Sequence, residues 1–141
     1  MQKPSVSKGD TFKLHVSPLL TRGLVHPMIQ MNLYPNLIPL DSAEKLDALF
    51  ERSNQRPVAL IKHSNTCGIS ADILYQLGRI DGDIHVLTIQ QNRPLSAFVA
   101  ERIGHRHQSP QVFVLKDGKA IYHATHYAID PDKIALLLAD L

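Results

Sequence analysis

Apolar runs and apolar residues at helical spacing alternate along residues 33–141, and this alternation predicts the elements of the fold. Runs typical of strands cover 37–40, 58–62, 83–90, 111–115 and 120–124. Apolar residues spaced by three and four positions predict helices over 42–53, 67–77, 94–103 and 131–141. The order β-α-β-α-β-α-β-β-α predicts an α/β fold, in which a central mixed sheet has helices on both faces and an antiparallel hairpin at one edge.

Residues that start helices or form tight turns mark the boundaries of these segments. Asp41 is predicted to cap the first helix, and Glu44 three residues later would complete a capping box. The Asp-Gly pair at 117–118 predicts the hairpin turn, because both residue types tolerate a positive φ. Asp130 followed by Pro131 predicts the start of the last helix.

The first 32 residues show neither pattern. Proline and glycine interrupt them at Pro4, Gly9, Pro18, Gly23 and Pro27. We therefore predict an irregular extension over 1–32 and a folded domain over 33–141. Methionines at 28 and 31 leave two interpretations open: a later start of translation, or a native extension that is mobile or packs on the domain.

Composition argues against two classes of partner. Lysine and arginine number 15 and aspartate and glutamate 13, so the net charge of +2 is too small and too evenly spread to predict nucleic-acid binding. No apolar run is long enough to span a membrane, and the amino terminus has no apolar core of signal-peptide length. We therefore expect a cytoplasmic protein in which a lone cysteine remains a free thiol.

The only cysteine of the chain lies in the stretch KHSNTCGIS, residues 62–70, between a predicted strand and a predicted helix. At a helix start, unpaired backbone N–H groups and the helix dipole favour the thiolate of Cys67 over its thiol. Ser70, one helical turn later, is close enough to donate a hydrogen bond to the sulfur but cannot form a disulfide with it. The motif therefore predicts one mixed disulfide at a time, resolved by an external thiol. The alternative is a buried cysteine that acts as a small hydrophobe, which the polar neighbours of Cys67 make less attractive.

A second feature is Pro110, which comes directly before a predicted strand. A proline there either begins an edge strand or forms a cis-proline turn. In the predicted order of elements, the loop that ends at Pro110 faces the start of the cysteine helix, because both lie at one edge of the sheet.

Four segments together resemble the monothiol bacilliredoxin-type (bacillithiol-system) thioredoxin-like family. They are KHSNTCGIS, NRPLSAFVAE, RHQSPQVF with KDGK after it, and HATHYAI. The resemblance runs from about Leu37 to the carboxyl terminus and implies a thioredoxin-like domain over 33–141. It also implies a thiol–disulfide oxidoreductase that removes bacillithiol, a low-molecular-weight thiol, from S-thiolated client proteins. Bacillithiol would be a co-substrate, and no cofactor is implied.

The same resemblance assigns roles to individual residues. Cys67 would be the nucleophile, Ser70 would occupy the place of a resolving cysteine, and Pro110 would be the cis-proline. Ser109 would present backbone groups to the substrate, and Thr66 and Gly68 would lie beside the sulfur.

Gly68 departs from the family pattern, in which proline often follows the cysteine. The resulting CGIS is also similar to the CGFS motif of monothiol glutaredoxins, which bind an iron–sulfur cluster through the cysteine and glutathione. A cluster carrier is therefore an alternative function, and a non-catalytic binding module that keeps the fold is another. Glycine at this position would make the helix start more flexible.

Eight histidines raise the question of a metal site, because histidine and cysteine are zinc ligands. We predict no metal, because His123 and His126 on a strand would point to opposite faces and one cysteine is few for a structural site. Arg106 and His107 are instead expected to favour the thiolate or to hold a carboxylate of the small thiol, unless they are solvated loop residues. Lys62 is expected to extend its amine to solvent at the end of its strand.

Overall fold

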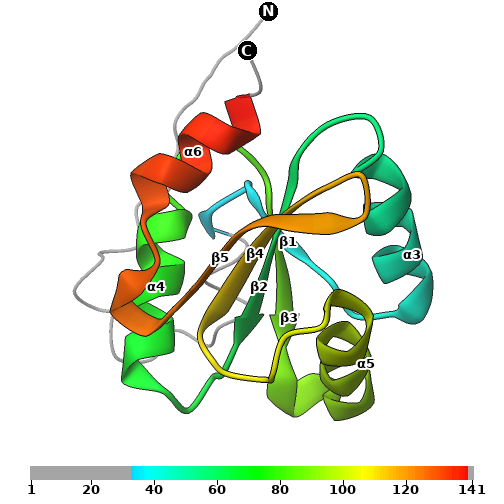
Figure 1. Cartoon of the computed structure of the whole chain (residues 1–141). Helices are drawn as coiled ribbons and strands as arrows, with labels where there is room; N and C mark the ends of the chain where they lie inside the picture. The colour runs from blue at the N-terminus through cyan, green and yellow to red at the C-terminus, as the bar shows by residue number, and fades with distance from the viewer. Residues whose placement is uncertain (1–32, 140–141) are drawn as a thin grey trace, which may run out of the picture. The chain divides into compact units, whose positions relative to one another are not determined.

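The computed structural model describes residues 33–139 (Figure 1), so the extension predicted over 1–32 lies outside the described residues. The strands are β1 (Leu37–Pro39), β2 (Val58–His63), β3 (Ile84–Thr88), β4 (Gln111–Lys116) and β5 (Lys119–Thr125). The helices are α3 (Ala43–Arg52), α4 (Gly68–Leu77), α5 (Arg93–Ile103) and α6 (Pro131–Ala139), with single 3-10 turns η1 (Ile89–Gln91) and η2 (His126–Ala128). This is the order predicted from the apolar pattern.

The five strands form one mixed sheet in the order β1-β3-β2-β4-β5. β1 and β2 both pair with β3 in parallel, whereas β4 pairs antiparallel with β2 and with β5. The predicted mixed sheet with an antiparallel hairpin at one edge is confirmed. Since Lys62 at the end of β2 lies opposite Gln111 at the start of β4, the segments after β2 and before β4 meet at the same edge of the sheet.

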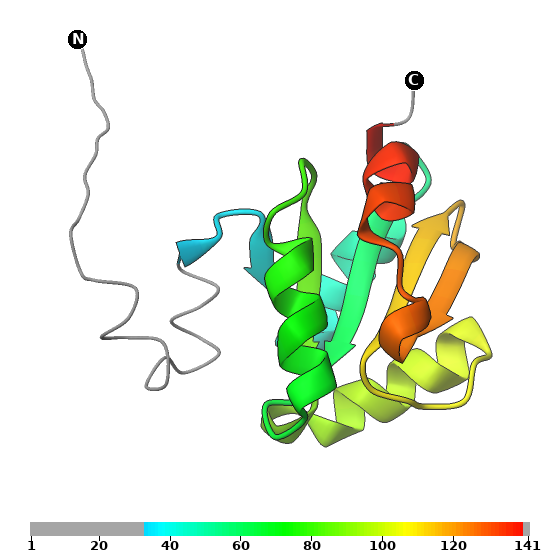
Figure 2. The same ribbon diagram turned by 90° about the vertical axis from the view of Figure 1, so that its left-hand side faces the viewer.

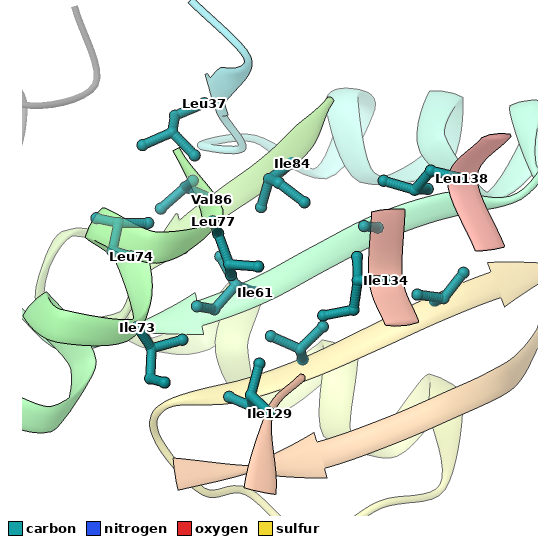
Figure 3. Close-up of a cluster of buried hydrophobic side chains, with 13 residues drawn as sticks. Leu37, Ile61, Ile73, Leu74, Leu77, Ile84, Val86, Ile129, Ile134 and Leu138 are labelled. Carbon is teal, nitrogen blue, oxygen red and sulfur yellow. The ribbon is translucent and has the colours of Figure 1, made fainter. Parts of the chain in front are cut away.

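Helices cover both faces of this sheet (Figures 1 and 2), and each face has its own apolar core. On one face, α4 and α6 pack against the alternate strand residues that point toward them (Figure 3). Labelled residues of this cluster include Leu37, Ile61, Ile73, Leu74, Leu77, Ile84, Val86, Ile129, Ile134 and Leu138. On the other face, α3 and α5 bury Leu46, Leu49, Phe50, Leu95 and Val99 against the intervening strand residues. The strands of the middle of the sheet are therefore buried on both sides, which explains their continuous apolar runs.

The boundaries of the elements follow their local sequence with two exceptions. The strand predicted over 83–90 ends at Thr88, and Ile89–Gln91 form η1. The turn between β4 and β5 has positive φ at Asp117 and Gly118, as the Asp-Gly pair predicts. Asp130 accepts backbone hydrogen bonds at the start of α6, as predicted. The prediction for α3 was one residue off: Ser42, rather than Asp41, is the N-cap, and its Oγ accepts from the Lys45 N–H at 3.1 Å.

Candidate active site

The thiol of Cys67 lies at the amino end of α4, at the edge of the sheet where β2 ends. Cys67 is the N-cap residue, with an extended backbone (φ −109°, ψ 120°), and its side chain makes no capping hydrogen bond. The thiol is free and partly exposed. The first N–H groups of a helix have no partner within it, and they lie at the end where the helix dipole favours negative charge. The local fold therefore places an accessible sulfur at the end of α4 where these N–H groups lie.

Pro110 lies at the same edge of the sheet, and the Ser109–Pro110 peptide bond is cis. The cis-proline that the resemblance implies is thus present. The Pro110 carbonyl oxygen accepts from the His126 N–H at 3.0 Å, which ties the loop to η2. η2 in turn packs against α4. These contacts join the proline loop to the cysteine helix through η2.

Ser70 braces the start of α4 from inside the protein. Its side chain is fully buried, and its Oγ accepts from the Ser64 N–H at 3.0 Å and lies 2.7 Å from Nδ1 of His63. The expected hydrogen bond from Ser70 to the sulfur of Cys67 is not among its contacts. The hydroxyl instead joins α4 to the last residue of β2 and to the residue after it.

His63 is a neutral residue at the base of the site. Burial lowers its pKa to about 4, although the contact with Ser70 acts in the opposite direction. Its Nε2 atom is buried and has no hydrogen-bond partner within residues 33–139. Because His63 is uncharged at pH 7, it contributes packing and one hydrogen bond but no positive charge toward a thiolate.

Gln90, which the sequence interpretation did not include, holds the loop between β2 and Cys67. Its Nε2 donates to Ser64 Oγ at 2.8 Å and to Thr66 Oγ1 at 3.4 Å, and its Oε1 accepts from the Asn65 N–H at 3.1 Å. A signal for it exists in the sequence, because Gln90 is the last residue of the strand predicted over 83–90, and the structure ends that strand, β3, at Thr88. Parallel strands end at the same edge of a sheet, so a polar residue after β3 is expected near the loop after β2.

The opposite face of the sheet holds a buried lysine. Lys62 is fully buried, so the expectation that it extends its amine to solvent is wrong. Its Nζ lies 3.3 Å from Nδ1 of His107, and the same Nδ1 atom lies 3.3 Å from Ser96 Oγ. Burial lowers the pKa of Lys62 to about 8. Burial, Lys62 and Arg93 each lower the pKa of His107. Arg106 and His107, which were predicted to act together, have different surroundings. His107 contacts Lys62, whereas the side chain of Arg106 is exposed and its backbone carbonyl accepts a hydrogen bond from Gln111 Nε2 at 2.9 Å.

Tyr127 on η2 adds an exposed aromatic ring to this edge of the molecule. Partial desolvation and the nearby carboxylate of Asp72 raise the pKa of its phenol, and Cys67 contributes in the same direction. The side chain is 64% exposed. Tyr127 is therefore available to contact a molecule that approaches the sulfur.

Comparison with known proteins agrees with this geometry. Residues 38–134 match the family model described as Monothiol bacilliredoxin BrxC. The chain belongs to this bacilliredoxin family. A solved protein described as a candidate oxidoreductase with a thioredoxin fold is 30% identical to the chain, with a TM-score of 0.66 over 73% of this chain and 94% of that one. Thioredoxin from Trypanosoma brucei brucei, 16% identical, has a TM-score of 0.59 over 76% of this chain and 91% of its own.

Membership of the bacilliredoxin family and the thioredoxin fold make this a protein of the thiol oxidoreductase type. Gly68 remains the departure that the sequence indicated, and a Cβ at this position would meet no atom within 4 Å. Within residues 33–139, no three His, Cys, Asp or Glu side chains are grouped so that they could hold a metal ion. None of the helices in that range is long and apolar enough to cross a membrane.

Proposed function

We propose that this bacilliredoxin removes bacillithiol from mixed disulfides on client proteins, with Cys67 as its nucleophile. The observation that carries the proposal is a lone, partly exposed thiol at the start of α4, with a cis-proline loop tied to η2, which packs against α4. The residue one turn later is Ser70, so the site contains no second thiol.

The proposed reaction is one thiol–disulfide exchange. The Cys67 thiolate attacks the bacillithiol sulfur of a protein mixed disulfide, forms a new disulfide with bacillithiol, and releases the client cysteine as a thiolate, which takes a proton from water. The client cysteine is reduced and Cys67 is oxidised, so the two proteins taken together undergo no net redox change, because one disulfide replaces another. A second thiol, from a small molecule or a reductase, then attacks the Cys67 disulfide and regenerates the free thiolate.

The surroundings of Cys67 support binding of a small anionic thiol. The helix start favours negative charge on the sulfur, and exposed Arg106 lies in the loop that leads to Pro110. His107 is held against Lys62, so we assign to Arg106 the larger part in attracting a carboxylate and to His107 a secondary part. Thr66, Gly68 and Ser109 complete the proposed contacts beside the sulfur.

The test is intact mass spectrometry after the reduced protein is mixed with a model protein that carries one bacillithiol. We expect one bacillithiol mass on the chain, located at Cys67, and equal loss from the model protein. Cys67→Ser should accept none while unfolding at the same denaturant concentration as the parent. Because serine replaces sulfur with a smaller oxygen at a partly exposed position, the fold should tolerate it.

The outcome against the proposal is no transfer of bacillithiol to a wild-type protein whose Cys67 is alkylated readily by iodoacetamide. The thiol would then be a nucleophile for another partner. In that case, anaerobic reconstitution with iron, sulfide and a thiol distinguishes the cluster-carrier alternative by its visible absorbance.

A further inference from the structure

The polar loop before Cys67 is held by one side chain from a different part of the chain. Gln90 contacts all three residues of the segment 64–66, through Ser64 Oγ, the Asn65 N–H and Thr66 Oγ1. Within the loop, Ser64 Oγ also lies 3.2 Å from Thr66 Oγ1 and accepts from the Thr66 N–H at 3.4 Å. These five contacts determine where each hydrogen of the network can point.

The orientation of the Gln90 amide follows from the backbone. The Asn65 N–H can only donate, so the amide atom that faces it at 3.1 Å must be the oxygen, Oε1. The amide nitrogen therefore faces the two hydroxyls and donates to them, most strongly to Ser64 Oγ at 2.8 Å. A hydroxyl oxygen accepts at most two hydrogen bonds, and Ser64 Oγ receives two, from Gln90 and from the Thr66 N–H.

The hydrogen of Ser64 must then point away from both donors, and Thr66 Oγ1 at 3.2 Å is the acceptor in its reach. Thr66 Oγ1 thus accepts from Ser64 and, more weakly, from Gln90. In the described part of the chain these are its two partners, and both are donors. The hydroxyl hydrogen of Thr66 is left for an acceptor outside the protein, on an exposed residue directly before Cys67.

We propose that Gln90 is a positioning residue that fixes Thr66 as a hydrogen-bond donor to the substrate held at Cys67. The inference rests on the proposed function, because it needs a bound mixed disulfide. The acceptor it selects is a carbonyl or carboxylate oxygen of the small thiol near its sulfur. Without Gln90, either hydroxyl of the Ser64–Thr66 pair could donate to the other, so the glutamine sets the direction of this hydrogen bond.

Gln90→Glu is the informative substitution. A carboxylate of nearly the same shape still accepts from the Asn65 N–H but cannot donate. Ser64 would then donate to Glu, and the Thr66 hydroxyl would turn to donate to Ser64 Oγ. The Thr66 hydroxyl would then no longer donate to the substrate, although residue 90 would still hydrogen-bond to the segment 64–66. Gln91→Glu is the matched control, because it adds the same charge one residue later on an exposed side chain.

The measurement is the steady-state transfer of bacillithiol, glutathione or cysteine from one model protein, with a free thiol in excess to release the accepted group from Cys67 and regenerate its thiolate. Iodoacetamide alkylation of Cys67 is a reference that needs no mixed disulfide. We expect Gln90→Glu and Thr66→Val each to raise KM about 3- to 10-fold, the effect of one lost hydrogen bond. The kcat and the alkylation rate should stay within about twofold of the parent. Thr66→Ser, which keeps the hydroxyl, should behave as the parent.

A double-mutant comparison shows whether Gln90→Glu acts by reorienting the Thr66 hydroxyl or by adding a negative charge. If Gln90 acts through Thr66, the double variant Gln90→Glu/Thr66→Val has the same KM as Thr66→Val alone. Equal effects of Gln90→Glu in both backgrounds, or the same rise in KM for Gln91→Glu, would overturn the inference while leaving transfer through Cys67 in place. A wild-type protein that is alkylated but accepts none of the three thiols would overturn the proposed function itself, and the inference with it.

Discussion

At the scale of single residues, Gly68 and Gly104 provide a matched pair. A Cβ added at either position would meet no atom within 4 Å, but Gly104 has φ +86° and Gly68 begins α4. Gly68→Ala should raise the free energy of unfolding by about 0.4–1 kcal/mol, because alanine restricts the unfolded chain without straining the helix. Gly104→Ala should lower it by about 1 kcal/mol, since the left-handed conformation is unfavourable for alanine. Urea unfolding of the two variants measures both.

The opposite sign at Gly68 would show that the helix start needs a glycine conformation. The rate of Cys67 alkylation provides a second control, because alanine at the first helical position retains the backbone N–H beside the sulfur. We expect that rate to stay within about twofold of the parent.

Individual site residues differ in how far the sequence predicts them. Cys67 and Pro110 could be placed, because a single thiol between a strand and a helix and a proline before a strand are local signals. The orientation of Ser70 could not, since His63 and Ser64 compete for its hydroxyl only once β2 lies beside α4. The burial of Lys62 also depends on tertiary structure, because its amine contacts His107, which lies far along the chain.

At the scale of elements, the start of α3 tests which of two adjacent residues caps it. Ser42 Oγ accepts from the Lys45 N–H, whereas Asp41 forms an exposed ion pair with Lys45 at 2.8 Å. Ser42→Ala should therefore lower the free energy of unfolding by about 1 kcal/mol. Asp41→Ala should cost only about 0.3–0.5 kcal/mol, the usual contribution of an exposed pair four residues apart. Denaturant unfolding at low salt compares the two.

A larger loss for Asp41→Ala than for Ser42→Ala would restore the capping box that the sequence suggested. Raising the salt concentration separates the two contributions further, because it screens the exposed ion pair and leaves the serine cap nearly unaffected.

The elements themselves were predictable because each local signal agrees with the tertiary structure. Buried strands read as continuous apolar runs, and Asp117-Gly118 adopts the positive φ values that its turn requires. The error at Asp41 arose because Asp and Ser are both good caps and Glu44 favoured the wrong one. The apolar pattern could not predict the order of the strands in the sheet, since the position of β3 between β1 and β2 depends on long-range pairing.

At the scale of the whole molecule, two buried histidines make stability depend on pH. Burial lowers the pKa of His63 and of His85 to about 4, and Arg52 also lowers that of His85. Between about pH 6.5 and pH 4 the unfolded chain therefore binds protons that the folded chain does not. Stability should be complete above pH 6.5 and fall as the pH drops toward 4, by roughly 2–3 kcal/mol for each histidine.

Urea unfolding at several pH values from 7 to 4.5 gives the number of protons taken up from the slope of the free energy. We expect His85→Phe to reduce this slope by about one proton, whatever its effect on absolute stability. A slope unchanged by this substitution would show that His85 is protonated in the folded protein. The same comparison with His63→Phe reports on the base of the active site.

Cys67 is the only cysteine of the sequence, and the residue one helical turn later is the buried Ser70, whose hydroxyl cannot resolve a disulfide. No group inside the protein can release the thiol that Cys67 has accepted. The occupied form therefore persists until another molecule arrives, and its lifetime is set by the supply of that molecule. When the supply is exhausted, each chain acts once, as a stoichiometric acceptor, and the occupied fraction becomes a record of how much reductant its surroundings contain.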